Sequence, residues 1–156
     1  MARLRASWIG LLVLPGLLVI GLSGLLAATT FTADTQKLVV RQWHGVHGGS
    51  AEMRVESIRS PKQWALAWQG LERPPPSGLP SAADQIGVLI ALGTKPTAGY
   101  AARLISATVN DGRLIVVGQQ IEPDPQQETA QILTQPWLLV LLDSDDLPVV
   151  VEQRFR

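Results

Sequence analysis

The apolar and polar residues of this chain alternate in short runs, and most of these runs have the character of β-strands. Residues 51–58 alternate cleanly, with Met53 and Val55 on one face, which is typical of a half-buried strand. Residues 86–92 are apolar on both faces, so we expect them to form a central strand. Further strands are expected at residues 37–43, 101–109, 114–121, 136–142 and 148–155.

One segment, residues 60–71, has the period of a helix instead. Ser60 suits the N-cap, Pro61 suits the first helical position and Gly70 suits the end of the helix. One face of this helix is apolar at spacings of three and four residues: Trp64, Ala67, Trp68 and Leu71. Because aromatic residues at helical spacing usually belong to a core, a core role for this face is favoured over a ligand-binding one. The pattern leaves open whether the two tryptophans face a sheet or solvent.

The connections between the strands are mostly short turns. Asn110-Asp111-Gly112 is a strong hairpin signal, and residues 44–50 form a glycine-rich turn. Six or seven strands with a single helix predict a mainly β (α+β) fold. We expect an antiparallel sheet or β-sandwich with one short helix on one side or end.

The first 33 residues differ in composition from the rest. Residues 8–29 contain no charge and are long enough to span a bilayer as a helix, for which about 20 residues are needed. Arg3 and Arg5 precede them and no acidic residue occurs before Asp34, so the N-terminus is expected in the cytoplasm. Small residues at 27–29 leave a cleaved signal peptide, and so a secreted form, as an alternative.

We therefore expect two parts: an anchor or signal segment at residues 1–33 and an extracytoplasmic β-rich domain at residues 34–156. The favoured location is a single pass through the inner or cytoplasmic membrane, with a periplasmic domain. The whole chain has 13 basic and 13 acidic residues, so the part beyond Arg3 and Arg5 is slightly acidic, which argues against nucleic-acid binding. The chain has no cysteine, which excludes disulfides and thiolate metal sites.

The candidate catalytic and metal-binding residues are few. His44 and His47 form the only histidine pair, without a recognisable third or fourth ligand, and fit a solvated turn better. Asp143, Asp145 and Asp146 lack the glycine and glutamate of a calcium loop. Because no nucleophile motif or phosphate-binding loop occurs either, we expect no catalytic residue, no metal and no cofactor, and a protein that is not an enzyme.

The most informative segment is the loop at residues 93–100, between two predicted strands. Pro96 fixes its own φ, and Gly99 can adopt a positive φ. Such a loop is either a rigid hairpin connection or a presented recognition loop. In the second case we expect a protein partner to bind five residues, with Thr97 bonding within the turn or to the partner: Lys95, Pro96, Thr97, Gly99 and Tyr100.

Three features resemble the C-terminal domain of the PrcB family of protease-complex-stabilising proteins. They are the segment Ile58–Trp68 with its spaced tryptophans, the loop Gly93–Tyr100 and the hairpin, Pro-rich loop and strand pair beyond Asn110. The loop is similar to the family's Gly-x-x-Pro-Thr-Gly-Gly-Tyr signature, with Ala98 where the family usually has glycine. The resemblance covers roughly residues 55–155. It implies an exported β-rich domain that binds and stabilises a protease or a related partner.

A second, weaker resemblance is to chagasin-type inhibitors of cysteine proteases, which have an immunoglobulin-like fold. Lys95–Tyr100 is similar to their Asn-Pro-Thr-Thr-Gly-Tyr loop, and Thr134–Trp137 to their Arg-Pro-Trp loop. Lys95 and Gln135 replace the asparagine and the arginine of these motifs. The function expected first is a membrane-anchored module that binds a protein and stabilises a protease or envelope complex. A cysteine-peptidase inhibitor is the alternative.

Overall fold

The computed structural model describes residues 37–77, 85–144 and 147–154. The predicted anchor segment, residues 1–33, lies wholly outside these ranges, and with it the predicted membrane span at residues 8–29. Within the described ranges, no helix has both the length and the apolar character needed to cross a bilayer.

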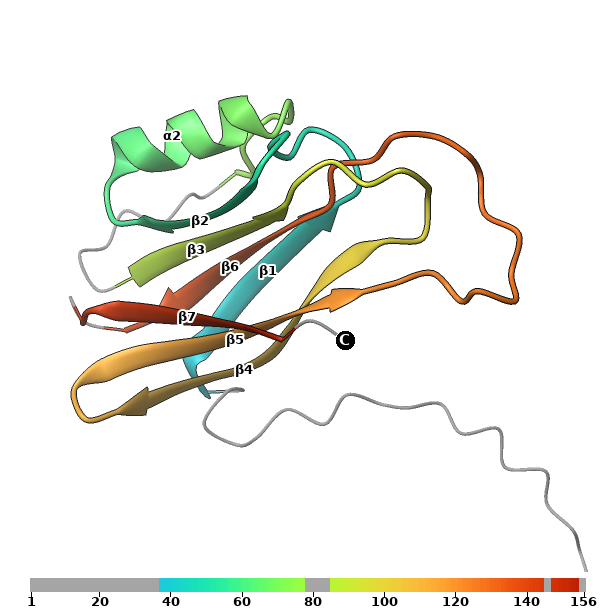
Figure 1. The fold of residues 1–156 in the computed structure, drawn as a ribbon. Helices are drawn as coiled ribbons and strands as arrows, with labels where there is room; N and C mark the ends of the chain where they lie inside the picture. Colours follow the sequence, from blue (N-terminus) through green and yellow to red (C-terminus); the bar gives the residue numbers. More distant parts are fainter. Residues whose placement is uncertain (1–36, 78–84, 145–146, 155–156) are drawn as a thin grey trace, which may run out of the picture.

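The described residues form seven strands and the helix α2, which confirms the expected mainly β class with one short helix (Figure 1). Their bounds are β1 (Val39–Gly45), β2 (Met53–Ile58), α2 (Pro61–Gly70), β3 (Gln85–Leu92), β4 (Ala101–Asn110), β5 (Arg113–Ile121), β6 (Trp137–Asp143) and β7 (Val149–Arg154). Asp111 and Gly112 both have positive φ, as the predicted tight hairpin between β4 and β5 requires.

The strands form two sheets. A four-stranded sheet has the order β1-β6-β3-β2 and is antiparallel throughout. A three-stranded sheet has the order β4-β5-β7, and here β7 lies parallel to β5. The expectation of an antiparallel arrangement is wrong for this last pair. The chain leaves β5, crosses to the other sheet as β6 and returns as β7, so β5 and β7 run in the same direction.

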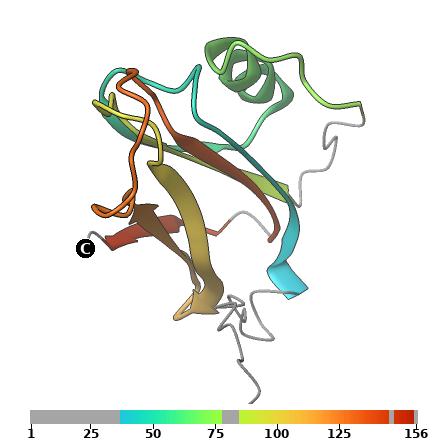
Figure 2. The same ribbon diagram turned by 90° about the vertical axis from the view of Figure 1, so that its right-hand side faces the viewer.

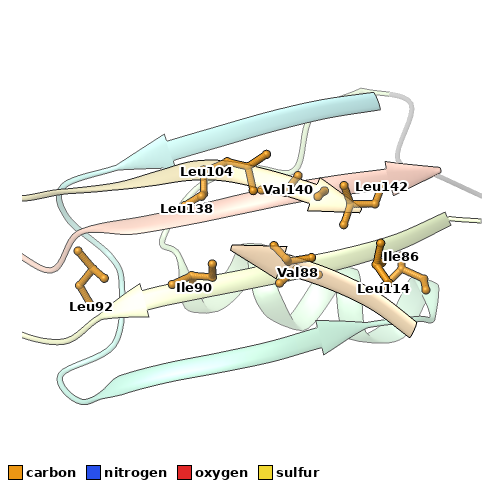
Figure 3. Close-up of a cluster of buried hydrophobic side chains, with 11 residues drawn as sticks. Ile86, Val88, Ile90, Leu92, Leu104, Leu114, Leu138, Val140 and Leu142 are labelled. Atoms are coloured by element: carbon orange, nitrogen blue, oxygen red, sulfur yellow. The ribbon is translucent and has the colours of Figure 1, made fainter. Parts of the chain in front are cut away.

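These elements stack in three layers, with α2 on one face of the four-stranded sheet and the three-stranded sheet on the other (Figures 1 and 2). This arrangement buries both faces of β3 and β6, which explains why both strands are apolar except for Gln85 at the start of β3 and Asp143 at the end of β6. Alternate residues of β3 and β6 point into the core between the sheets, where they meet Leu104 and Leu114 (Figure 3). The remaining residues of the two strands point toward α2.

Helix α2 packs as its sequence predicts. Ser60 is its N-cap and forms a capping box with Gln63, and Trp64, Ala67 and Trp68 are buried. The rings of Trp64 and Trp68 meet Trp43 of β1 edge to face, at centroid distances of 6.2 Å and 5.4 Å. The apolar helix face therefore belongs to a core, as its spacing favoured, and the structure shows that it packs on the four-stranded sheet.

Two details of the first strands differ from expectation. Strand β1 runs to Gly45, because its pairing with β6 continues to Trp137, so His44 lies in a strand and not in the turn. Met53 and Val55 were expected on the buried face of β2, but they are 49% and 41% exposed. Their side chains lie on the face of the four-stranded sheet that packs against the three-stranded sheet, because their partners Leu92 and Ile90 belong to the core between the sheets. The three-stranded sheet does not extend far enough to cover them.

Candidate functional site

Three loops meet at one end of the sandwich, and we call this region the loop end (Figure 1). They are residues 46–52 between β1 and β2, residues 93–100 between β3 and β4, and residues 122–136 between β5 and β6. The second and third loops form an isolated β-bridge between Lys95 and Thr134. The Lys95 amide donates to the Thr134 carbonyl at 2.8 Å, and the Thr134 amide donates back at 3.0 Å.

Further bonds attach the loops to one another. The Ala98 amide donates to the carbonyl of Ala130 at 3.0 Å, which holds the far side of the predicted recognition loop. The first loop joins through the amide of Gln135, which donates to the carbonyl of Val46 at 2.8 Å. The indole of Trp137 donates to the carbonyl of His47 at 2.8 Å. The backbone of all three loops is therefore fixed by bonds between segments far apart in the sequence.

The five predicted partner-binding residues lie together in the second loop, on this framework. Gly99 has φ +94°, as expected, and a Cβ atom added there would lie 2.7 Å from Cβ of Pro123. The carbonyl of Thr97 accepts a hydrogen bond at 3.0 Å from the hydroxyl of Thr134, which is 2% exposed. This bond uses the backbone carbonyl of Thr97, so the role expected for its hydroxyl, a bond within the turn or to a partner, stays a prediction.

The side chains of Lys95 and Tyr100 lie next to each other. The ammonium nitrogen of Lys95 is 5.6 Å from the centre of the Tyr100 ring, within the range of a cation–π contact. Both residues are half-buried, whereas Pro96 is exposed. Each of the three therefore keeps some accessible surface at the loop end, and their contact with a partner stays a prediction.

The sequence analysis did not identify the most exposed apolar residues of this region. Ile132 is 49% exposed and Leu133 is 70% exposed. They are flanked by Ala130 and Thr134, both of which are bonded to the second loop. The available signal was a pair of large apolar residues within an otherwise polar stretch, where no strand or helix pattern calls for them.

A narrow cleft between β3, β4 and β5 has about 10 Å³ of free space, enough for about one water molecule. Within the described ranges, no group of three histidine, aspartate or glutamate side chains is placed to hold a metal ion. His44 and His47 are both exposed, and Asp145 and Asp146 lie outside the described residues.

A comparison with protein families finds a match to the family described as PrcB C-terminal, over residues 86–143. This range runs from β3 to the end of β6 and includes the second and third loops. It does not include the Ile58–Trp68 segment on which part of the resemblance rested, and similarity to chagasin-type inhibitors is not found. The comparisons with curated proteins and with solved structures gave no match. The predicted resemblance to the PrcB C-terminal family is thus confirmed, for the residues that form the centre of the fold and two of the three loops of the loop end.

Proposed function

We propose that this chain is a non-enzymatic module that binds a protein partner through its loop end and so stabilises a protease or envelope complex. The match to the PrcB C-terminal family supports an association with a protease complex. The choice of surface rests on the exposure of Leu133. Its side chain is 70% exposed, although the amide and the carbonyl of the next residue, Thr134, are both hydrogen-bonded to Lys95.

A leucine held outward on a fixed backbone favours binding for a thermodynamic reason. Contact between its apolar surface and water is unfavourable. Burying a side chain of this size in an interface therefore contributes about 1.5–3 kcal/mol of favourable binding free energy. Because the loop is already ordered, little conformational entropy remains to be lost on binding. Ile132 and Val46, which are 49% and 44% exposed, are further exposed apolar residues of the same three loops, and Lys95 and Tyr100 are amphipathic residues there.

The membrane tether and the extracytoplasmic location belong to this proposal as well. They are supported by the uncharged run at residues 8–29 and by the two arginines before it. A phosphatase that is active only outside the cytosol, fused after Arg156, tests the orientation. We expect activity in the fusion, and an inactive but intact fusion protein would contradict the extracytoplasmic location.

The binding surface can be tested by cross-linking in the native membrane. A photoreactive amino acid replaces Leu133 in one variant of the full chain and Leu66 in a control. Leu66 is 56% exposed on α2, so it matches the exposure at a distant surface. We expect a covalent adduct with a protease, or with a subunit of its complex, from position 133 and not from position 66. Equal adducts at both positions, or none at either, would contradict the assignment of the loop end.

A paired variant tests the predicted residues themselves. Lys95→Glu combined with Leu133→Asp reverses a charge and adds another on the apolar surface, and both side chains have accessible surface in the fold. We expect recovery of the partner to fall at least about tenfold, because truncation of central interface residues costs about 2 kcal/mol or more. Leu66→Asp serves as the control for an added surface charge.

The peptidase-inhibitor alternative has one observation in its favour: the Lys95–Thr134 bridge places the two similar segments side by side. Against it, Trp137 is 0% exposed and lies under α2, so its ring is not presented to a peptidase. Titration of a papain-like peptidase with the full chain separates the two functions. Stoichiometric inhibition would support the alternative, whereas unchanged activity at high micromolar protein would remove it.

A further inference from the structure

Strand β2 has one edge that no other described strand pairs with. It is the outer strand of the four-stranded sheet, and among the described residues it pairs only with β3 (Figure 1). The Leu92 amide donates to Pro136, on the β6 side of β3. Leu92 is paired with Met53, and the backbone N–H and C=O groups of successive residues in a strand point alternately to either side. The backbone N–H and C=O groups that point away from β3 are therefore those of Met53, Val55 and Ser57. An unpaired row of this kind is able to bind another strand.

Both faces of β2 present side chains that suit such a pairing. On one face, Met53 and Val55 are 49% and 41% exposed, although both are apolar. On the other face, the side chains of Arg54 and Glu56 are 48% and 37% exposed and lie 3.8 Å apart, measured from Nε to Oε2. Helix α2 covers β3 and β6 and leaves these two charged residues accessible.

The charges on β2 are complementary to those of the same strand in the reverse direction. We propose that two copies of this chain pair through antiparallel β2 strands, with Val55 on the two-fold axis. In this register Arg54 of each copy lies opposite Glu56 of the other, and Met53 lies opposite Ser57. The two sheets then form one continuous sheet of eight strands, and the exposed apolar residues of both copies meet beside the axis.

The same charges select this register over its neighbours. Moving the axis to Arg54 places two arginines opposite each other and Glu56 opposite Glu52, while moving it to Glu56 places two glutamates together. Like charges directly opposite are destabilising in antiparallel strands. In the proposed register the Arg54–Glu56 pairs occupy non-hydrogen-bonded positions, where opposite Cα atoms are closest, at about 4.5 Å. This interaction does not involve the loop end, so its test is independent of the test of the proposed function.

Cross-linking with a single cysteine tests the pairing, because the chain contains no cysteine of its own. Val55→Cys places two thiols across the axis with Cα atoms about 5.5 Å apart, a separation that a disulfide can span. Val109→Cys is the control, since Val109 is 49% exposed at the end of β4 in the other sheet. We expect the full chain in mild detergent to form a disulfide dimer at position 55 at least tenfold faster than at position 109. Equal rates would overturn the proposal.

Exchange of the two charges tests the register. Arg54→Glu and Glu56→Arg each place like charges opposite one another at two symmetric positions. We expect each variant to weaken dimer association, measured by analytical ultracentrifugation of the full chain, by about tenfold. The double variant Arg54→Glu/Glu56→Arg restores both opposite pairs and is expected to restore association. The proposal would be overturned if the single exchanges left dimer association unchanged. It would also be overturned if association did not recover in the double variant although its thermal unfolding was unchanged.

Discussion

At the scale of single residues, the loop end depends on a few backbone conformations that the residue types allow. Gly99 adopts the positive φ expected of it, whereas Ala98, which stands where the PrcB family usually has glycine, does not need one. Among the described residues other than glycine, only Glu72 and Asp111 have positive φ. The substitution at position 98 is thus compatible with the loop, and its amide still reaches Ala130.

Gly99 and Gly112 allow the cost of backbone strain to be separated from the cost of a clash. Both have positive φ, but a Cβ atom at Gly112 meets no atom within 4 Å, whereas at Gly99 it meets Pro123 at 2.7 Å. We expect Gly112→Ala to lower the free energy of unfolding by about 1 kcal/mol and Gly99→Ala by about 2–4 kcal/mol. Denaturant unfolding of the full chain measures both, and equal losses would mean that the contact with Pro123 is unimportant.

Exposure was the residue property that the sequence did not predict. The alternation in β2 correctly predicts that Met53 and Val55 share a face, but their exposure depends on how far the second sheet extends. Leu133 is exposed because Thr134 is fixed by a partner nearly 40 residues earlier in the chain. Both properties arise from long-range packing, which local periodicity does not contain.

At the scale of elements, those with strong local signals were predicted best. The helix has a capping box, a proline at its start and a glycine at its end, and its bounds agree with expectation to within a residue or two. Strands β3 and β6 were both predicted as strands, and the apolar run at residues 86–92 also predicted burial of β3 on both faces. The direction of β7 was not predictable from its own residues, since it follows from the passage of β6 through the other sheet.

Packing between α2 and β3 is tight enough to be tested by a double-mutant cycle. A Cβ atom at Gly87 would lie 2.6 Å from Cζ2 of Trp64. Gly87→Ala is therefore expected to lower the free energy of unfolding by about 1–3 kcal/mol, and Trp64→Leu by about 3 kcal/mol. Because leucine lacks the outer ring atoms, the double variant should lose at least about 1 kcal/mol less than the sum of the single losses. Additive losses would show that the indole does not require the glycine.

At the scale of the whole molecule, the four-stranded sheet belongs to two cores at once. Strands β3 and β6 supply Val88 and Val140 to the core between the sheets, and Leu89 and Leu139 to the core under α2. A change in one core therefore alters the backbone that supports the other. This shared layer also places the three loops at one end, because every one of them begins or ends on a strand of the four-stranded sheet.

The shared layer predicts that the two cores unfold together. Trp43, Trp64, Trp68 and Trp137 all lie in the core under α2, so in a Trp8→Phe background their fluorescence reports on that core alone. Leu104→Ala removes a side chain that is 1% exposed from the other core and should cost about 2–5 kcal/mol. We expect this loss to shift the fluorescence transition and the far-ultraviolet circular dichroism transition equally in denaturant titrations. If the fluorescence midpoint stays in place while the dichroism midpoint falls, the two cores are independent. In that case the four-stranded sheet would not link the unfolding of the core under α2 to the unfolding of the core between the sheets.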